Sequence, residues 1–336
     1  MAVALPKLQE NTHPLDRLHD LLSDDMNAVN SMILARMNSP VTLIPQLAGY
    51  LVAAGGKRIR PLLTLASAKL CGADMARAHR LATAVEFIHS ATLLHDDVVD
   101  ESHERRGQKS ANVVFGNTAS VLVGDFLFSR AFQLMVEDGS LTTLKILSDA
   151  SAIIAEGEVL QLSTQNNLKT TMDDYLKVIE GKTASLFSAA CEVGPVIAGS
   201  PASYQDALRA YGLSLGMAFQ IVDDVLDYNA EREKLGKTVG DDFREGKITA
   251  PILMALEKAT SSELDFWKRT LQDKEQSDQD LRQAQDFLRQ HGAYDRGLAL
   301  AKNYGMRALE SLNILPSGAL TSSLADLVTF TLNRSH

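Results

Sequence analysis

The 336-residue sequence has few cysteines, few aromatic residues and few turn-forming residues. Its two cysteines, Cys71 and Cys191, are too few for a disulfide scaffold, and their apolar surroundings predict free thiols in a reducing compartment. Aromatic residues make up only 6% of the chain, so Leu, Ala, Ile, Val and Met dominate the apolar content and favour helices over sheets. Nine prolines and 21 glycines exclude a many-turned sandwich or a disordered chain.

Basic residues are also in deficit. The 33 Lys and Arg face 42 Asp and Glu, and the resulting net charge of −9 argues against a general nucleic-acid binder. Residues 1–14 contain no basic segment followed by an apolar core, which predicts the absence of a signal peptide. No window of about 20 residues is both apolar and uncharged, and the best candidate is 183–198. We therefore expect a cytoplasmic protein without a transmembrane segment, whose membrane contact, for product release, would be peripheral.

Helical periodicity runs through almost the whole chain. Apolar residues recur at three- and four-residue steps, and no convincing alternating strand is found. No linker rich in Pro, Gly or Ser divides the chain, so we predict one all-α domain over residues 1–336, with residues 1–14 flexible. The expected helices cover residues 18–37, 42–54, 60–71, 75–101, 118–138, 140–165, 172–192, 201–229, 248–258, 261–272, 277–290, 293–313 and 317–332.

Two acidic motifs carry the clearest chemical signal. Residues 96–100 and 223–227 share the pattern Asp-Asp-x-x-Asp, and each follows an apolar run at the C-terminal end of an expected helix. On a helix the first and last carboxylates of each motif are about 40° apart, and like charges at this end are unfavourable without a cation. Oxygen donors without His or Cys favour Mg²⁺, which also bridges to phosphate oxygens. The expected metal ligands are Asp96, Asp97, Asp100, Asp223, Asp224 and Asp227.

Other interpretations of these acids are weaker. Carboxylates also gather by chance at solvated helix ends, but two matched copies after apolar runs make chance a poor explanation. A di-iron carboxylate bundle would require Glu-x-x-His on two facing helices. Glu86 and His89 fit that spacing once, and no second copy exists.

A basic segment near the N-terminus is the first of several candidate anion sites. Residues 55–61, Gly-Gly-Lys-Arg-Ile-Arg-Pro, join a glycine pair to three cations at the start of an expected helix. Backbone N–H groups there, with Lys57 and Arg60, form an anion site. His89 lies seven residues before Asp96 and therefore on the same helical face.

Further cations flank the acidic motifs. Arg105 and Arg106 follow the first motif directly, while Lys237 and Lys247 lie on either side of residues 240–246 after the second. Each cation alone reads as an ordinary solvated charge. Their placement beside both acidic motifs predicts a diphosphate-binding cavity, because guanidinium and ammonium groups bind phosphate oxygens directly.

These motifs together resemble the trans-isoprenyl diphosphate synthases over nearly the whole chain, from about Leu15 onwards. The residues around the first motif look most like bacterial long-chain members, the decaprenyl and octaprenyl diphosphate synthases of ubiquinone biosynthesis. The motifs that carry the resemblance, in the family's order, are residues 55–61, Leu94-His95-Asp96-Asp97-Val98-Val99-Asp100, Arg105-Arg106-Gly107, Gly181-Lys182-Thr183 and Gly216-Met217-Ala218-Phe219-Gln220-Ile221-Val222-Asp223-Asp224.

The resemblance implies a fold, a reaction and a set of ligands. The fold is a large bundle of long helices around a central cavity, of the isoprenoid synthase type, and the assembly is a homodimer. The reaction is a Mg²⁺-dependent, consecutive head-to-tail condensation of isopentenyl diphosphate onto an allylic diphosphate, farnesyl or geranyl, with two or three Mg²⁺ ions in each active site. The implied product is decaprenyl diphosphate for the ubiquinone side chain.

The resemblance also assigns residue roles, which we carry over as expectations. The six motif aspartates, Lys182 and Arg105 would be catalytic. The allylic diphosphate would be held by Arg105, Lys182, Thr183, Gln220, Lys237 and Lys247, and isopentenyl diphosphate by Lys57, Arg60, His89 and Arg106.

Product length depends in this family on side chains just before the first motif. Bulky residues four or five positions earlier block the tunnel in short-chain members, whereas Thr92 and Ala91 are small here, which predicts an open tunnel. Helical spacing places Thr92 near the Asp96 face, but Ala91 is assigned by the resemblance alone. Phe87 and Ile88 lie one turn deeper. The small residues would also be explained by close helix packing without any tunnel.

Four alternative functions stay open from the sequence. An octaprenyl or solanesyl synthase, or a short-chain geranylgeranyl or farnesyl synthase, would use the same motifs and differ in product length. A class I terpene cyclase needs no isopentenyl site, so residues 55–61 argue against it. A non-catalytic subunit of a heteromeric prenyl synthase could lose its acidic motifs, and both are intact here.

Overall fold

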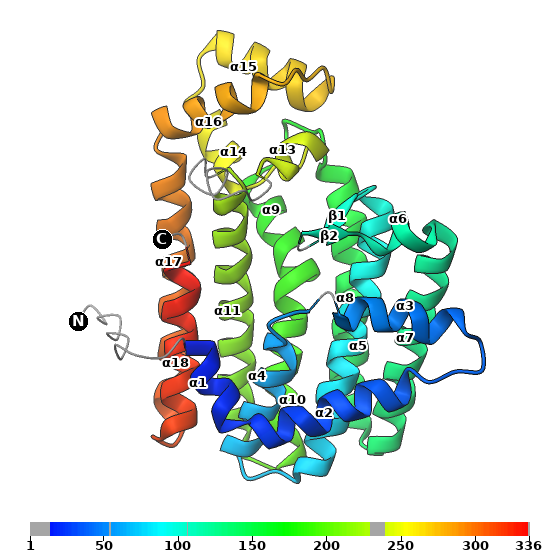
Figure 1. Ribbon diagram of the computed structural model, residues 1–336. Helices are drawn as coiled ribbons and strands as arrows, with labels where there is room; N and C mark the ends of the chain where they lie inside the picture. Colours follow the sequence, from blue (N-terminus) through cyan, green and yellow to red (C-terminus); the bar gives the residue numbers. More distant parts are fainter. Residues whose placement is uncertain (1–13, 54, 106, 229–238, 335–336) are drawn as a thin grey trace.

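The computed structural model describes residues 14–53, 55–105, 107–228 and 239–334 (Figure 1). The expected all-α architecture is confirmed. Long helices run side by side and form the body of the molecule, while shorter helices cover one end (Figure 1). The helices of the N-terminal half are α1 (Pro14–Leu21), α2 (Ser23–Arg36), α3 (Leu43–Ala53), α4 (Ile59–Leu70), α5 (Met75–Val99), α6 (Ala111–Phe115), α7 (Asn117–Asp138) and α8 (Leu141–Thr164).

The C-terminal half continues the bundle and adds the short covering helices. Its helices are α9 (Met172–Ile179), η1 (Glu180–Ala184), α10 (Ser185–Ile197), α11 (Ala202–Asp227), α13 (Asp241–Glu245), α14 (Ala250–Leu256), α15 (Ser261–Trp267), η2 (Lys268–Gln272), α16 (Asp280–Gln290), α17 (Ala293–Ser311), η3 (Leu312–Ile314) and α18 (Ala319–Leu332).

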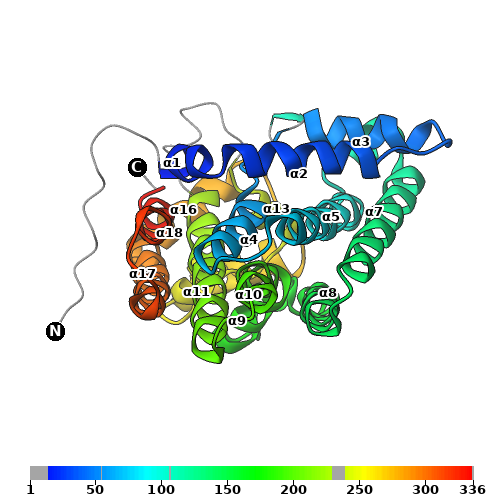
Figure 2. The same cartoon turned by 90° about the horizontal axis from the view of Figure 1, so that it is seen from below.

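The long helices pack around α10 and α11. Helix α5 packs against α7 and α4, and α10 packs against α4, α8 and α11. Seen from below, α1, α2 and α3 lie in a row along one side, across long helices viewed nearly end-on (Figure 2). Buried Leu, Ala, Val and Phe side chains of these helices form the main core, and a second apolar cluster lies where α14 to α17 meet the end of α11.

One glycine allows η1 to approach α11 closely. A Cβ atom at Gly216 would lie 2.6 Å from the Cα atom of Ala184, closer than real Cβ atoms come to other heavy atoms. Glycine therefore lets the backbone of η1, which carries the candidate substrate ligands Lys182 and Thr183, pack directly onto the helix of the second acidic motif.

The structure corrects three details of the predicted elements. The expected helix 172–192 is interrupted by the π-helical turn η1, and residues 18–37 belong to two helices, α1 and α2. A two-residue ribbon, β1 (Glu104–Arg105) with β2 (Gln108–Lys109), was not predicted. Strands of two residues are too short to show an alternating pattern.

Helix α7 is more apolar than the sequence analysis indicated. By length and composition it is, among the described residues, the one helix that could span a membrane, with a mean hydropathy of 1.4 in its most apolar window. Only 39% of that window is buried, and the helix carries the charged residues Asp125 and Arg130. Its exposed apolar side chains include Leu122 and Val136, which are 62% and 65% exposed.

Candidate active site

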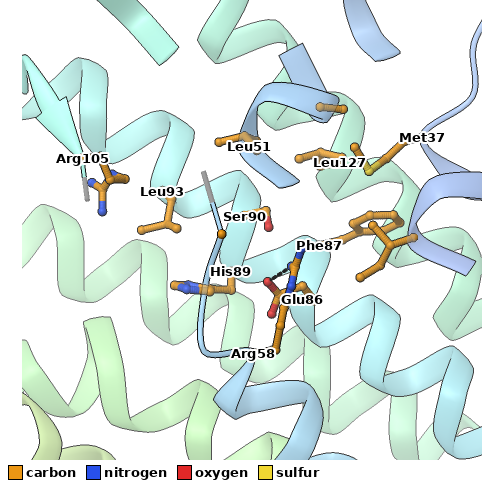
Figure 3. A pocket seen from close by; sticks show the side chains of 13 residues that line it. Met37, Leu51, Arg58, Glu86, Phe87, His89, Ser90, Leu93, Arg105 and Leu127 are labelled. Atoms are coloured by element: carbon orange, nitrogen blue, oxygen red, sulfur yellow. Dashed lines mark hydrogen bonds and ion pairs between the residues drawn. The ribbon is translucent and has the colours of Figure 1, made fainter. Parts of the chain in front are cut away.

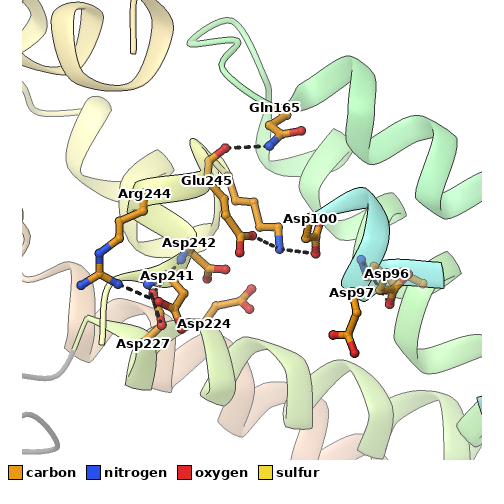
Figure 4. Close-up of polar contacts among 12 residues, drawn as sticks. Asp96, Asp97, Asp100, Gln165, Asp224, Asp227, Asp241, Asp242, Arg244 and Glu245 are labelled. Carbon is orange, nitrogen blue, oxygen red and sulfur yellow. Dashed lines mark hydrogen bonds and ion pairs between the residues drawn. The ribbon is translucent and has the colours of Figure 1, made fainter. Parts of the chain in front are cut away.

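The two acidic motifs lie at the ends of two long helices, as predicted. Asp100 follows the last residue of α5, and Asp227 is the last residue of α11. Figure 4 shows Asp96, Asp97 and Asp100 on one side of the site and Asp224 and Asp227 on the other. The bundle thus brings together two carboxylate walls that are far apart in the sequence.

Lys247 connects the first acidic motif to the end of α13. Its Nζ atom lies 3.0 Å from Asp100 Oδ2, and it also pairs with Glu245 at the end of α13 (Figure 4). Burial works to lower the pKa of Lys247, but the charges of Asp242, Asp100 and Glu245 outweigh this effect and raise it. Lys247 therefore stays protonated and holds the segment after α13 against the first motif.

Lys182 and Arg105 also lie against the first motif. Lys182 Nζ lies 3.8 Å from Asp96 Oδ2. Asp97 is only 1% exposed, and its Oδ1 accepts a 2.8 Å hydrogen bond from Arg105 Nε. The ribbon β1–β2 therefore places Arg105 against the first motif.

The second motif is tied to η1 and α9 by a chain of hydrogen bonds. Tyr175 Oη donates to Asp224 Oδ2 at 2.6 Å, and Gln220 Nε2 donates to Asp224 Oδ1 at 2.7 Å. Gln220 Oε1 accepts in turn from Thr183 Oγ1 at 2.8 Å. Asp227 accepts from the backbone N–H of Asp242 at 3.0 Å, which anchors the start of α13. Thr183 and Gln220 thus adjoin the motif, as predicted.

Crowding and burial keep several of these carboxyls from ionising readily. Burial is the largest cause in each case, and neighbouring carboxylates add to it. It raises the pKa of Asp224 to about 7 and that of Asp227 to about 6, and it also raises the pKa of Asp96 and Asp242. The site therefore contains too little positive charge to balance its carboxylates. A bound divalent cation would supply that charge.

The donor set fits Mg²⁺ shared with a diphosphate. Within the described ranges, no three His, Cys, Asp or Glu side chains converge closely enough to enclose a metal ion alone. Mg²⁺ commonly binds through one or two carboxylates and completes its shell with water and phosphate oxygens. Asp96, Asp100, Asp223 and Asp227 are half-buried, whereas Asp97 and Asp224 are buried and hydrogen-bonded to protein donors.

Two of the expected isopentenyl ligands, Arg60 and His89, are in contact, and His89 lines a cavity. Arg60 Nη1 lies 3.1 Å from His89 Nε2, and the Arg60 guanidinium stacks 4.5 Å from the centroid of the Phe187 ring. Lys57 lies 5.0 Å above the ring of Phe330. Figure 3 shows the cavity, whose polar end holds Arg58, Glu86, His89 and Arg105 and whose apolar end holds Phe87, Leu51, Met37 and Leu127.

The chain-length residues lie on different sides of α5. Phe87 lines the cavity of Figure 3 together with Ser90 and Leu93. Ala91 and Ile88 are 0% and 1% exposed and face the core. Thr92 is half-buried, and its hydroxyl donates to the backbone oxygen of His89 at 2.8 Å.

Two predicted ligands, Arg106 and Lys237, lie outside the described residues. The structure adds others that no motif indicated. Glu158 on α8 accepts from Lys182, and Arg334 at the end of α18 lies 3.7 Å from Asp223 Oδ1 and stacks on Phe219. Nothing in the local sequence marks them, because their partners come from other helices. Tyr175, Asp242 and Glu245 were missed for the same reason.

Comparisons with known proteins identify the family of the chain. The profile of the Polyprenyl synthetase family matches residues 41–288. The octaprenyl diphosphate synthase of Escherichia coli (strain K12) is 42% identical over 320 residues, which cover 95% of this chain and 99% of that enzyme.

Solved structures match the whole bundle. A decaprenyl diphosphate synthase from Rhodobacter capsulatus superposes with a TM-score of 0.93 at 49% identity, covering 96% of this chain and 100% of that one. A polyprenyl synthase from Caulobacter crescentus CB15, complexed with calcium and isoprenyl diphosphate, gives a TM-score of 0.93 at 48% identity, covering 98% and 100%. With its motifs assembled at one site and relatives matched nearly end to end, this chain belongs to the polyprenyl synthetase family.

Proposed function

We propose that this chain makes decaprenyl diphosphate for the ubiquinone side chain, by adding isopentenyl diphosphate head to tail onto farnesyl or geranyl diphosphate. It is a long-chain polyprenyl diphosphate synthase and therefore a prenyltransferase. The observation that carries the condensation chemistry is the pair of facing carboxylate walls, with Lys182 beside Asp96 and Lys247 beside Asp100. The product length rests on the likeness to the decaprenyl diphosphate synthase from Rhodobacter capsulatus. Octaprenyl and nonaprenyl diphosphates are the nearest alternative products.

The allylic diphosphate would bind between these walls. Lys182, Lys247 and Arg105 each lie against a carboxylate of the first motif and can turn to phosphate oxygens at short distance. Thr183 and Gln220 approach from the second wall. Lys237 joins this set by the family resemblance alone.

The polyprenyl synthetase family is metal-dependent, and we assign Mg²⁺ to this site, with two or three ions. The half-buried Asp96, Asp100, Asp223 and Asp227 would hold them, while Asp97 and Asp224 contribute by orienting Arg105 and Gln220. Bound Mg²⁺ supplies stabilisation of the negative charge on the departing diphosphate. The nearby ammonium and guanidinium groups add to it in a partly buried site.

Isopentenyl diphosphate would bind at the other basic cluster. Arg60 and His89 are in contact, and Lys57 and Arg106 complete the set by the family resemblance. The allylic C–O bond breaks with both electrons going to the diphosphate, and the isopentenyl double bond attacks the allylic carbon. The proton released on forming the new double bond goes to the departed diphosphate. Phe87 and Leu127 line an apolar cavity that keeps water from the cation.

The exposed face of α7 supports a homodimer. Leu122, Val136, Phe132 and Val121 are 62%, 65%, 39% and 38% exposed on this helix. Apolar helix faces of this kind mark interaction sites, and a second copy of the chain offers the same patch in a two-fold arrangement. We place the enzyme in the cytoplasm, in keeping with the free thiols Cys71 and Cys191, and any membrane contact is peripheral.

Metal-dependent condensation is the direct test of this function. Purified protein is incubated with farnesyl diphosphate, labelled isopentenyl diphosphate and Mg²⁺, with and without EDTA. Transfer of label into acid-labile, solvent-extractable prenyl diphosphate only in the presence of Mg²⁺ is the expected result. No transfer by folded protein would instead favour a non-catalytic subunit.

A further inference from the structure

Lys182 is held by a carboxylate that belongs to neither acidic motif. Its Nζ atom lies 2.8 Å from Glu158 Oε2 on α8, against 3.8 Å from Asp96 Oδ2 on α5. The side chains of Lys182 and Glu158 are only 21% and 26% exposed. The closest partner of this expected diphosphate ligand is therefore Glu158.

Two glycines bring the backbones of these residues together. A Cβ atom at Gly157 would lie 2.7 Å from the backbone N of Lys182, and one at Gly181 would lie 3.1 Å from the Cα of Gly157. Helix α8 and the π-helical turn η1 therefore cross backbone to backbone at the residues next to Glu158 and Lys182. The side chains of Glu158 and Lys182 both start at this backbone contact, so their ion pair follows from the packing of the two main chains.

The second carboxylate oxygen of Glu158, Oε1, makes no hydrogen bond to the described residues. Glu158 Oε1 is buried and lacks a hydrogen-bond partner within the part of the chain that the structure describes. Buried side-chain oxygens usually have a hydrogen-bond partner, so an unpaired one indicates a role beyond connecting two helices. Lys182 is the hydrogen-bond partner of the other carboxylate oxygen, Oε2.

Two carboxylates thus share one ammonium, and the closer one is outside the motif. A lysine side chain is long and flexible, so holding its charge at one place before substrate binds lowers the entropy lost on binding. The pair with Glu158 also leaves the Asp96 oxygens a full 3.8 Å from Nζ, and so available to a metal ion. The negative charge of Glu158 itself repels a diphosphate. Glu158 can therefore favour substrate binding only through the position in which it holds the Lys182 ammonium.

We propose that Glu158 is a positioning residue that holds the Lys182 ammonium at the allylic diphosphate and away from Asp96. This inference rests on the proposed function. Glu158 acts through Lys182 and does not contact the reacting carbons.

The test compares Glu158→Ala and Glu158→Gln with Glu156→Ala, an exposed acid on the same helix. KM for farnesyl diphosphate, KM for isopentenyl diphosphate, kcat and Tm are measured for each. We expect Glu158→Ala to raise KM for farnesyl diphosphate about tenfold, the usual effect of losing a charged hydrogen bond, and to leave KM for isopentenyl diphosphate within about twofold. Glu158→Gln keeps an acceptor oxygen and should recover part of the loss, and Glu156→Ala should match the wild type.

A double-mutant cycle separates positioning from a merely structural ion pair. If Glu158 acts through Lys182, Glu158→Ala adds no further loss in a Lys182→Ala background. Additive losses, equal changes in both KM values, or a wild-type KM with a lowered Tm would overturn the inference. Should Glu158→Ala not fold, Glu158→Gln in the same cycle decides.

Measuring the wild-type protein in the same assay distinguishes a failure of the positioning role from a failure of the proposed function. If the wild type elongates and the Glu158 variants keep its KM values, only the positioning role fails. If the wild type does not elongate, the proposed function itself fails.

Discussion

At the residue scale, the site is governed by an excess of carboxylates in partly buried positions. Asp96, Asp224, Asp227 and Asp242 are all harder to ionise than a free aspartate, chiefly because they are buried. Lys182 and Lys247 offset part of this charge. The remaining negative charge favours the binding of divalent cations. Because protons compete with a cation for the same carboxylates, metal binding depends on pH.

This coupling predicts how stability depends on pH. The pKa of Asp224 is raised from 3.8 to about 7 and that of Asp227 to about 6, so between about pH 4 and 7 the folded metal-free protein binds more protons than the unfolded chain. Its free energy of unfolding therefore falls as the pH rises through this window. Mg²⁺ binds the deprotonated carboxylates, so we expect it to raise Tm more at about pH 8 than at about pH 5.5.

Differential scanning calorimetry in EDTA and in Mg²⁺ measures this effect at both pH values. A Tm shift of the same size at both would mean that Asp96 and Asp227, the proposed ligands with raised pKa values, do not bind the metal.

The motif residues could be predicted from the sequence, but only some of their partners could. The six aspartates, Lys182, Thr183 and Gln220 stand in recognisable local patterns, and the structure gathers them at one site. Glu158 and Arg334 stand in no pattern. Their roles depend on contacts with helices that are distant in the sequence, and such contacts leave no local signal.

At the element scale, the important feature is the π-helical turn η1 between α9 and α10. Periodicity predicted one continuous helix there, because a single extra residue in a turn hardly disturbs the apolar pattern. The turn lets Lys182 face α8 while Thr183 faces α11. π-Helical turns of this kind occur frequently at functional sites.

The close contact between η1 and α11 gives a prediction for Gly216→Ala. The added methyl group would lie 2.6 Å from the Cα of Ala184 and push η1 away from the second motif. We expect a loss of about 1–3 kcal/mol in the free energy of unfolding, by analogy with other overpacked sites, and a weakened Thr183–Gln220 contact.

Chemical denaturation and steady-state kinetics on the same variant measure both effects. Gly49→Ala on α3 is a suitable control, because a Cβ there meets no atom within 4 Å. Equal stability of the two variants would show that η1 and α11 do not need the glycine.

At the scale of the whole molecule, composition and periodicity were sufficient to predict one all-α bundle. They did not predict which helix faces meet solvent. Helix α7 packs on α5 with one face and exposes Leu122 and Val136 on another, and the sequence places apolar residues on both faces. The distinction comes only from the packing of neighbouring helices.

The exposed α7 face predicts self-association. We expect Leu122→Glu with Val136→Glu to convert a dimer to a monomer in light scattering, because two charges would be buried at the contact. Leu264→Glu on α15, where the leucine is 44% exposed, is the control and should leave the mass unchanged. A wild-type monomer that sediments with lipid vesicles would assign the α7 face to membranes.

Two neighbouring substitutions test along which side of α5 the product chain grows. Ala91→Phe tests the side of α5 indicated by the family resemblance, and Ser90→Phe tests the side that lines the cavity of Figure 3. We expect Ala91→Phe to shorten the product, because a phenyl ring would fill space below the first motif. A product shortened by Ser90→Phe alone would place the growing chain along Phe87, Ser90 and Leu93. Tm of both variants shows whether overpacking affects the fold.

The length of the wild-type product tests the central claim most directly. Products formed from farnesyl diphosphate and excess isopentenyl diphosphate in Mg²⁺ are dephosphorylated and sized by reversed-phase chromatography against polyprenol standards. A long-chain synthase with the proposed product gives a main peak at about ten isoprene units. A main peak at three or four units would contradict the assignment of a long product while keeping the chemistry of the two carboxylate walls.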